Sequence, residues 1–155
     1  MVDLSDEQIE NIVRLSYPYV ALYNVNNKFA LDDGAAIYAG GWNEIVAHTT
    51  LTDHTLQSIS RPNNDTLYIF AMIDVRQEPM ILEFPSFDSD YVSLMVTAYD
   101  HYVNVPMSTT QGDFDKPSRI LFYSQRTPGY RGEPVRGVDR VMELTGDFVS
   151  AVIRV

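Results

Sequence analysis

The apolar run at residues 67–73 constrains the fold more than any other stretch of this sequence. Both alternating sets of its side chains are apolar: Leu67, Ile69, Ala71 and Ile73 on one side, and Tyr68, Phe70 and Met72 on the other. Because successive residues of a strand point to opposite faces of the sheet, a strand with this pattern has both faces covered. We therefore predict a central strand over residues 66–75, with one face against N-terminal helices.

Further strands are predicted after this run, since short apolar segments alternate with turns rich in Pro, Gly, Asp and Ser. They span residues 80–84, 91–99, 102–106, 119–123 and 148–155. Residues 125–137 contain two prolines, three glycines and three arginines, and this composition predicts an exposed loop.

The N-terminal part of the chain has a helical pattern. Ser5 can cap a helix that begins at about Asp6, with Gln8 as its capping-box partner. Apolar residues then recur at helical spacing, although Pro18 predicts a kink or a fresh helix start. The pattern therefore predicts that the chain begins with helices packed on the later strands.

Residues 37–49 predict at best short, broken helices, because a Gly-Gly pair interrupts them. Helices first and strands second indicate an α+β fold, with N-terminal helices packed on a mainly antiparallel β-sheet. A length of 155 residues predicts one domain over residues 1–155.

Charge and composition exclude several classes of function. The net charge of -10 repels phosphate backbones and anionic lipids, so neither nucleic acid nor a membrane is expected as a partner. The chain has no cysteine, and it lacks the common serine-hydrolase, phosphate-binding, dinucleotide and zinc-peptidase motifs. The spacing of its histidines does not suit metal ligands. We therefore expect no metal and no cofactor.

Two polar clusters are candidate sites. The stretch RPNNDTLY, residues 61–68, is interpreted as a turn that feeds the central strand, or alternatively as amides and a carboxylate held for a ligand. The stretch TAYDHYVNV, residues 97–105, is interpreted as a strand with Tyr99 and His101 on one face. If this strand lies beside the central one, Asp65 or Tyr68 can reach His101 and close a pocket with aromatic walls.

Three functions from different classes fit these clusters. The first is binding of a small molecule or sugar in a pocket lined by Asn63, Asn64, Tyr68, Tyr99 and Asn104. The second is a hydrolase-type acid/base enzyme with His101 as base and Asp65 or Asp100 as its carboxylate. The third is a structural or assembly domain that holds no ligand.

Four segments together carry a family resemblance: RPNNDTLYIFAMIDV, HYVNVPMSTTQGDF, ILFYSQRTPGYRGEPVRGVD and LTGDF. They are similar to the uncharacterised bacterial family called domain of unknown function 1254, and the resemblance extends from about Tyr17 to the end of the chain. The signature positions of that family fall on Asn63, Asp65, Thr66 and Tyr68, and on Asn104 and Val105. The resemblance implies a family fold without a settled activity.

The C-terminal strand raises the question of what lies beside it. The resemblance implies that a second domain, domain of unknown function 1214, with a jelly-roll-like sheet, usually follows in relatives. The predicted strand at residues 148–155 ends without a turn or cap, and a bare apolar edge invites pairing with another chain. We expect this edge to be covered by that missing C-terminal domain or by a second copy in a homo-oligomer.

The N-terminus lacks the charge and apolar pattern of a signal peptide. A soluble, cytoplasmic protein is expected as the chain stands. A periplasmic or secreted protein is expected instead if Met1 begins a mature form, since many members of the resembled family carry export signals.

Overall fold

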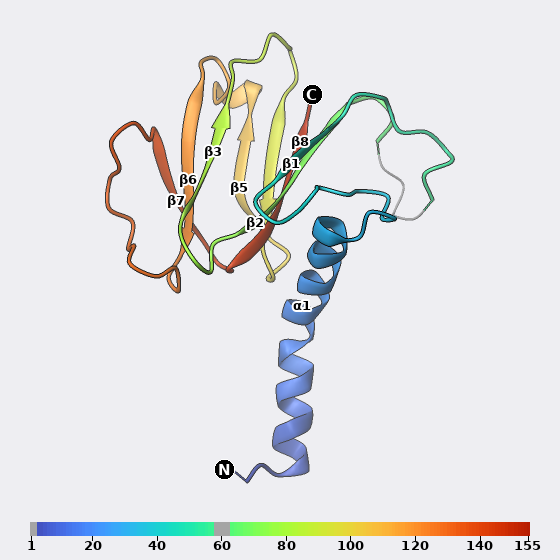
Figure 1. Ribbon diagram of the computed structural model, residues 1–155, viewed down its shortest axis with the longest axis vertical. Coiled ribbons are helices and arrows are strands. Elements are labelled where there is room, and N and C mark those ends of the chain that lie inside the picture. The colour runs from blue at the N-terminus through green and yellow to red at the C-terminus, as the bar shows by residue number, and fades with distance from the viewer. Residues whose placement is uncertain (1–2, 58–62) are drawn as a thin grey trace.

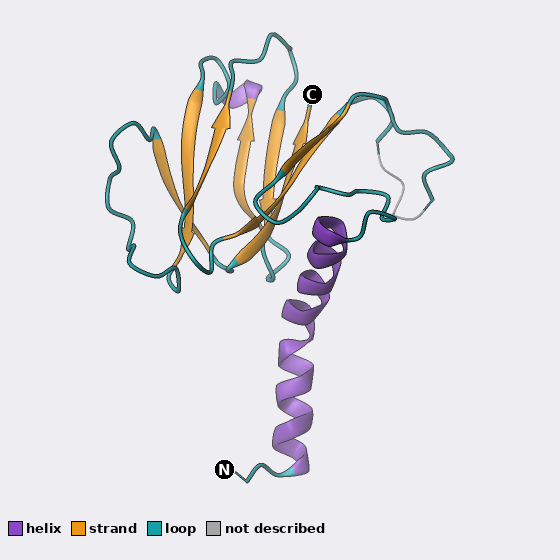
Figure 2. Ribbon diagram, viewed as in Figure 1, coloured by secondary structure: helices purple, strands orange, loops and turns teal. Residues whose placement is uncertain are grey.

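One N-terminal helix precedes two β-sheets in the computed structural model, which describes residues 3–57 and 63–155 (Figures 1 and 2). Helix α1 spans Asp6–Leu31. The strands are β1 (Ile45–His48), β2 (Tyr68–Asp74), β3 (Met80–Phe84), β4 (Ser93–Thr97), β5 (Val103–Ser108), β6 (Ser118–Ser124), β7 (Arg140–Leu144) and β8 (Phe148–Arg154), with a short 3-10 helix, η1 (Thr109–Gln111), after β5. The predicted α+β fold is confirmed.

The five-stranded sheet has the order β1-β2-β8-β4-β5, and all its neighbours are antiparallel. Strand β2 lies between β1 and β8, as its two-sided apolar pattern predicted. One face of β2 places Ala71 and Ile73 in the main core, and the other face packs Phe70 and Met72 against Ala30 at the end of α1. Both faces of this strand are therefore covered, one of them by the helix.

The three-stranded sheet has the order β3-β6-β7 and packs its buried face against the five-stranded sheet. Strands β6 and β7 are parallel, and parallel neighbours need a long crossover because the chain must return to the starting end. The loop predicted at residues 125–137 supplies most of this crossover. Strands β6 and β7 consequently end at the same edge, with Ser124 paired to Leu144.

The terminal strand β8 is not an edge strand. It pairs with β2 on one side and with β4 on the other, so that Ala151 lies opposite both Ala71 and Val96. The prediction of a bare apolar edge at residues 148–155 is therefore wrong, because two strands from earlier in the chain cover it. The expectation that a further domain or a second copy covers this strand was based on an exposed edge, and β8 has no exposed edge.

Two predicted segments differ from the structure. Residues 45–48 form strand β1 instead of part of a broken helix, and they pair along β2. Residues 97–105 do not form one strand, since β4 ends at Thr97, β5 begins at Val103, and His101 has a left-handed φ of 62° in the turn between them. The alternation argument that placed Tyr99 and His101 on one face does not apply to a turn.

Helix α1 begins as predicted and continues through Pro18 to Leu31. The Ser5 side chain accepts a bond from the Gln8 amide at 3.3 Å, and the Gln8 side chain accepts one from the Ser5 amide at 2.8 Å, which completes the capping box. Pro18 lies inside the helix, so no fresh helix starts there. The C-terminal half packs on β2 and β8, whereas the N-terminal half projects beyond the sheets (Figure 1). None of the helices in the described part of the chain has the length and hydropathy that a membrane span requires.

Candidate functional site

The RPNNDTLY stretch forms a turn whose polar groups bond to one another. Arg61 and Pro62 lie outside the described residues. The Asn63 side chain accepts a bond from the Asp65 amide at 2.6 Å and donates one to the Thr66 hydroxyl at 3.2 Å. The Asn63 amide donates to the buried Tyr68 hydroxyl at 3.1 Å. The interpretation of this stretch as a turn that feeds the central strand therefore agrees with the structure, because the Asn63 side chain is occupied within the turn.

The two sequence clusters lie at opposite ends of the five-stranded sheet. Tyr68 and Ser93 both pair with Arg154, at one end of β8, whereas Thr97 pairs with Ser150 near the other end. Strand β8 also separates β2 from β4. The structure therefore does not bring Asp65 or Tyr68 to His101, and the pocket predicted to join them is not formed. The prediction failed because a strand distant in sequence lies between the two segments.

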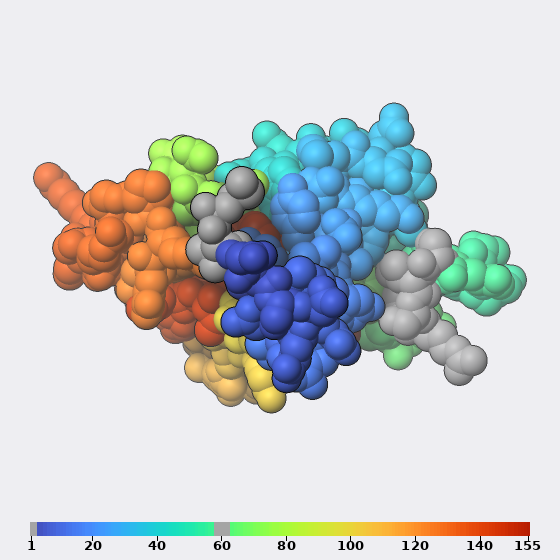
Figure 3. All heavy atoms as spheres, turned by 90° about the horizontal axis from the view of Figure 1, so that it is seen from below, coloured from blue at the N-terminus to red at the C-terminus, as the bar shows by residue number. Residues whose placement is uncertain are grey.

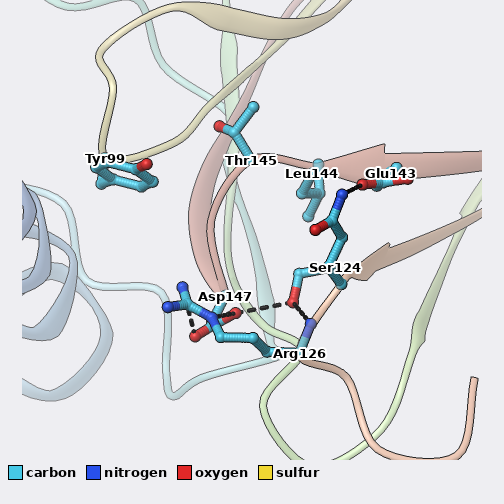
Figure 4. A pocket seen from close by; sticks show the side chains of 8 residues that line it. Tyr99, Ser124, Arg126, Glu143, Leu144, Thr145 and Asp147 are labelled. Atoms are coloured by element: carbon cyan, nitrogen blue, oxygen red, sulfur yellow. Dashed lines mark hydrogen bonds and ion pairs between the residues drawn. The ribbon is translucent and has the colours of Figure 1, made fainter. Parts of the chain in front are cut away.

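The end of the sheets that carries the 98–102 turn, the lower end in Figure 1, contains a pocket of about 480 Å³. Its lining is mostly polar and comes from three chain segments: Tyr99, Ser124, Gln125, Arg126, Glu143, Leu144, Thr145 and Asp147 (Figure 4). One of these residues, Tyr99, was predicted as a ligand-binding residue. His101 is exposed in the turn and does not line this pocket.

The parallel pairing of β6 and β7 explains why these segments meet. Both strands end at this edge, so the residues that follow Ser124 and those around Leu144 lie side by side. The connection from β7 to β8 then crosses from one sheet to the other past the 98–102 turn. The backbone passes close to the Tyr99 ring here, since a Cβ on Gly146 would lie 3.1 Å from it and would require the ring to shift by a few tenths of an ångström.

A polar network of three buried residues and the exposed Arg126 lies at the wall of the pocket, and we call Ser124, Arg126, Thr127 and Asp147 the Asp147 network. The Asp147 carboxylate accepts bonds from the Ser124 hydroxyl at 2.8 Å and from Arg126 Nε at 3.0 Å, and Arg126 Nη2 lies 2.9 Å from its other oxygen (Figure 4). Thr127 accepts a bond from the Ser124 amide at 2.9 Å and donates one to the Val75 carbonyl at 2.9 Å. The network therefore connects the ends of β2, β6 and β8 across the two sheets.

A second group of bonds holds the opposite wall. Glu143 accepts bonds from the Gln125 side chain at 2.8 Å and from the Tyr123 hydroxyl at 3.1 Å. Burial, together with this bond to Glu143, raises the pKa of Tyr123 above its ordinary value. Burial also raises the pKa of Tyr130, whose ring lies edge-on against Tyr123.

The remaining rim is held by residues of the 98–102 turn and the start of β5. Thr145 donates its amide to the Asn104 side chain at 2.9 Å, and its hydroxyl lies 2.7 Å from an Asp100 carboxylate oxygen. Asn104, predicted as a ligand-binding residue, thus positions a lining residue of the pocket. Asn64, Asp65 and the rest of the other cluster remain at the far end of the sheet.

The buried tyrosines predict a loss of stability at high pH. Because folding raises the pKa of Tyr123 and Tyr130, their contribution is complete below about pH 10, the pKa of an unfolded tyrosine, and is lost as the pH rises further. We expect the Tyr123→Phe variant to lose less unfolding free energy than the parent between about pH 9 and pH 11. Urea unfolding across this range measures the difference. The exposed Tyr102→Phe variant serves as control, and an equal alkaline loss in all three proteins contradicts the assignment.

Sequence reasoning missed Ser124, Arg126, Glu143 and Asp147 as site residues. The first two lie in the segment YSQRTPG and the last in LTGDF, both of which carried the family resemblance. The sequence gives no signal that these two segments meet, because only the pairing of β6 with β7 brings them to the same edge. No cluster of three or more histidine or acidic side chains suited to a metal ion occurs within residues 3–57 and 63–155.

Comparison with known proteins gives a family match without a function. Residues 42–155 match the family described as "Protein of unknown function (DUF1254)". The match begins after α1 and is therefore shorter than the resemblance from about Tyr17 that the sequence motifs suggested. A search of curated proteins found no match.

Two solved structures from bacteria are similar to this chain. The VPA0106 protein from Vibrio parahaemolyticus is 30% identical over 60% of this chain, with a TM-score of 0.53, and the match covers 23% of that protein. An uncharacterised protein from Burkholderia cenocepacia is 16% identical over 91% of this chain, with a TM-score of 0.47, and the match covers 36% of that protein. The chain therefore spans much less than half the length of either relative.

Proposed function

Given that this chain belongs to the DUF1254 family of proteins of unknown function, we propose that it binds a small polyhydroxylated molecule of monosaccharide size in the pocket beside Tyr99. The observation that carries the proposal is the pocket itself. Its volume of about 480 Å³ falls within the range of about 300–1,000 Å³ that is usual for small-molecule sites. Its lining combines one aromatic ring with several polar side chains from a rigid sheet end.

The lining offers hydrogen-bonding groups that the fold does not use. Arg126 contacts Asp147 through Nε and Nη2, and its Nη1 has no hydrogen-bond partner among the described residues. The Gln125 side chain donates from its amide nitrogen to Glu143, and its amide oxygen accepts no hydrogen bond from the described residues. Ligand hydroxyl groups both donate and accept hydrogen bonds, so they match a lining that mixes donors and acceptors.

The charge of the pocket favours an uncharged ligand over an anion. Glu143 and Asp147 contribute two carboxylates against the single guanidinium of Arg126, and the whole chain carries a net charge of -10. An exposed aromatic face such as that of Tyr99 can pack against the apolar face of a sugar ring. These two features together point to neutral sugars or polyols.

The geometry favours binding over acid/base catalysis. The proposed pair of His101 and Asp65 is separated by the length of the sheet. Ser124 is buried and donates its hydroxyl to Asp147, so its proton has a carboxylate partner and its oxygen faces the Asp147 network. Nucleophilic catalysis needs a nucleophile paired with a base beside an open site, and the described lining residues include no histidine to serve as that base.

Calorimetric titration of the protein with a panel of neutral hexoses, disaccharides, polyols and one uronic acid tests the proposal. We expect a neutral sugar to bind, and we expect the Tyr99→Ala variant to lose roughly fivefold in affinity because it removes a stacking surface worth about 1 kcal/mol. The Tyr102→Ala variant is the matched control, since this tyrosine is exposed in the same turn and does not line the pocket.

Two results contradict this proposal. The first is that no neutral sugar or polyol of the panel binds to the folded parent protein. The second is that the Tyr99→Ala variant binds as tightly as the parent. Circular dichroism and thermal unfolding of both tyrosine variants establish that they are folded.

A further inference from the structure

A second pocket lies at the opposite end of the five-stranded sheet from the pocket beside Tyr99. Figure 3 looks at the lower end of the molecule, from which α1 projects, whereas the second pocket lies at the upper end in Figure 1, near the C-terminus and η1. Its volume is about 240 Å³, and Tyr91, Ser93, Ser108 and Arg154 contribute polar groups to its lining. Among the described residues that line this pocket, Arg154 carries the only formal charge.

Strand pairing places the polar residues of this pocket in one row. Arg154 of β8 lies opposite Tyr68 of β2 on one side and opposite Ser93 of β4 on the other. Ser93 in turn lies opposite Ser108 of β5. Residues directly opposite each other project to the same face of a sheet, with Cβ atoms about 4.5–5.5 Å apart. The same face carries Val152, which packs against the end of α1, and the row continues beyond the helix onto β4 and β5.

The Arg154 guanidinium is held in place but has no counter-ion. Its central carbon lies 5.6 Å from the centre of the Tyr68 ring, within the range of a cation–π contact. Its Nε is buried and has no hydrogen-bond partner among the described residues. Arg154 also forms no ion pair within residues 3–57 and 63–155, and the sequence of residues 1–2 and 58–62 contains no aspartate or glutamate. The carboxylate side chains of the protein therefore leave the charge of this guanidinium without a direct partner.

Other arginines of the chain do have such partners. Four of them form ion pairs with carboxylates at 2.7–2.9 Å: Arg76, Arg119, Arg126 and Arg140. Asp113 accepts a bond from the amide of the lining residue Ser108 at 3.0 Å, but its other oxygen is paired with Arg140 at 2.7 Å, so its charge is offset. The net charge of -10 acts at long range, and salt screens charges that lie more than about 8 Å apart at physiological ionic strength. The unpaired guanidinium therefore dominates the local field.

We propose that the second pocket, which we call the Arg154 pocket, binds a small monocarboxylic acid through its carboxylate. A guanidinium binds a carboxylate through two parallel hydrogen bonds, and this geometry makes arginine the usual partner of that group. The Ser93 and Ser108 hydroxyls lie in the same row and supply further donors. Each shares one bond with a neighbouring hydroxyl in which either oxygen can donate, so each can turn its own proton toward a ligand oxygen.

The rest of the pocket suits a short apolar chain. Met95 and Pro106 lie opposite each other on the same face, one step along β4 and β5 from the serines, and both are exposed. A ligand chain that lies on these two residues removes apolar surface from water. The volume of about 240 Å³ lies below the usual range of about 300–1,000 Å³, which indicates a ligand of few atoms. One cation beside an apolar strip favours one carboxylate with a hydrocarbon chain over a dianion.

Amide NMR titration of the isotopically labelled protein with hexanoate tests this proposal. Hexanamide has nearly the same shape without the charge, and inorganic phosphate has the charge without the chain. We expect hexanoate to bind with a Kd on the order of 1 mM, because a ligand this small makes few contacts. The largest shift changes are expected at Ser93, Ser108 and Arg154. We expect hexanamide and phosphate to bind at least severalfold more weakly.

Variants of the row identify the group that holds the carboxylate. Arg154→Gln is expected to lose about tenfold or more in affinity for hexanoate, because it removes a hydrogen-bonded charge. Arg154→Lys keeps the charge without the planar fork and is expected to show an intermediate loss. Arg119→Gln is the matched control, since it removes one positive charge from the three-stranded sheet and is expected to bind hexanoate like the parent. Ser93→Ala makes a smaller change in the pocket and is expected to weaken binding severalfold. Circular dichroism checks that each variant is folded.

Several results overturn the proposal. One is that hexanoate causes no saturable shift changes at Ser93, Ser108 and Arg154 in the parent. Another is that hexanamide or phosphate binds as tightly as hexanoate, and a third is that Arg154→Gln and Arg119→Gln have equal effects. None of these results depends on whether the pocket beside Tyr99 binds a sugar, so the two proposals fail separately.

Discussion

The Asp147→Ala variant is expected to lose about 3 kcal/mol of unfolding free energy. The Asp147 side chain is only 9% exposed, and its carboxylate holds the Ser124 hydroxyl and two nitrogens of Arg126. Truncation leaves the buried Ser124 hydroxyl without its acceptor and removes the side chain that joins the ends of β6 and β8. The Arg126 side chain is 62% exposed and remains solvated, so the loss stays near the lower end of the range for a broken buried pair.

Two matched variants separate this network effect from a general effect of removing charge. Asp147→Asn keeps an oxygen that can accept the bonds of Ser124 and Arg126, and it is expected to lose only about 1 kcal/mol. Glu83→Ala breaks an exposed ion pair with Arg119 and is expected to lose less than about 0.5 kcal/mol. Urea unfolding at neutral pH gives all three values. Equal losses in Asp147→Ala and Glu83→Ala contradict the structural role of the network.

The Phe148→Ala variant is expected to lose about 4 kcal/mol and to loosen α1 from the sheets. Phe148 is 2% exposed, and its ring contacts Tyr19 and Tyr23 of α1 at 5.0 Å and Trp42 at 6.1 Å. Removal of the ring leaves a cavity at the junction that fixes the helix. We expect both a lower unfolding midpoint and faster amide hydrogen exchange in the C-terminal half of α1.

Phe148→Leu is the graded control for this prediction. Leucine fills most of the volume of the ring, and the loss is expected to fall to about 1.5 kcal/mol. Hydrogen exchange in α1 is then expected to remain close to that of the parent. If Phe148→Ala unfolds like the parent, or if exchange in α1 is unchanged while the protein is destabilised, the aromatic junction does not anchor the helix.

The sequence predicted those elements whose signal is local. The capping box at Ser5 and Gln8 marked the start of α1, and the two-sided apolar run at residues 67–73 marked β2 as a central strand. Strand β3 was predicted with the bounds that the structure shows, Met80–Phe84. These features follow from capping chemistry and from the two-residue period of a strand, both of which are readable without knowledge of distant contacts.

Strand β8 has the same two-sided apolar pattern as the central strand β2. Phe148 and Val152 point to one face of β8, and Val149, Ala151 and Ile153 point to the other, so both of its faces are apolar. The criterion that identified β2 as central therefore also applied to β8. The prediction of an exposed edge was wrong because this two-sided apolar pattern belongs to a strand that pairs on both sides.

The candidate site could not be predicted, because long-range pairing places its parts together. The 98–102 turn is closed by Asp100, whose side chain accepts a bond from the Tyr102 amide at 3.1 Å, and this local signal contradicted the prediction of one strand over residues 97–105. The parallel pairing of β6 with β7 has no local signal, and β7 was not predicted. Tyr99 was the one predicted ligand-binding residue that lines the pocket, and the prediction of a second domain beyond residue 155 stays a prediction.

The most direct test of the proposed binding site is a titration of the isotopically labelled protein, monitored by amide NMR, with the neutral sugar that binds best in calorimetry. The account predicts that the largest shift changes occur at Tyr99, Gln125, Arg126 and Thr145, all of which line the pocket at the lower end of the sheets. Shift changes concentrated instead at Asn63 and Tyr68, at the opposite end of β2, would contradict it.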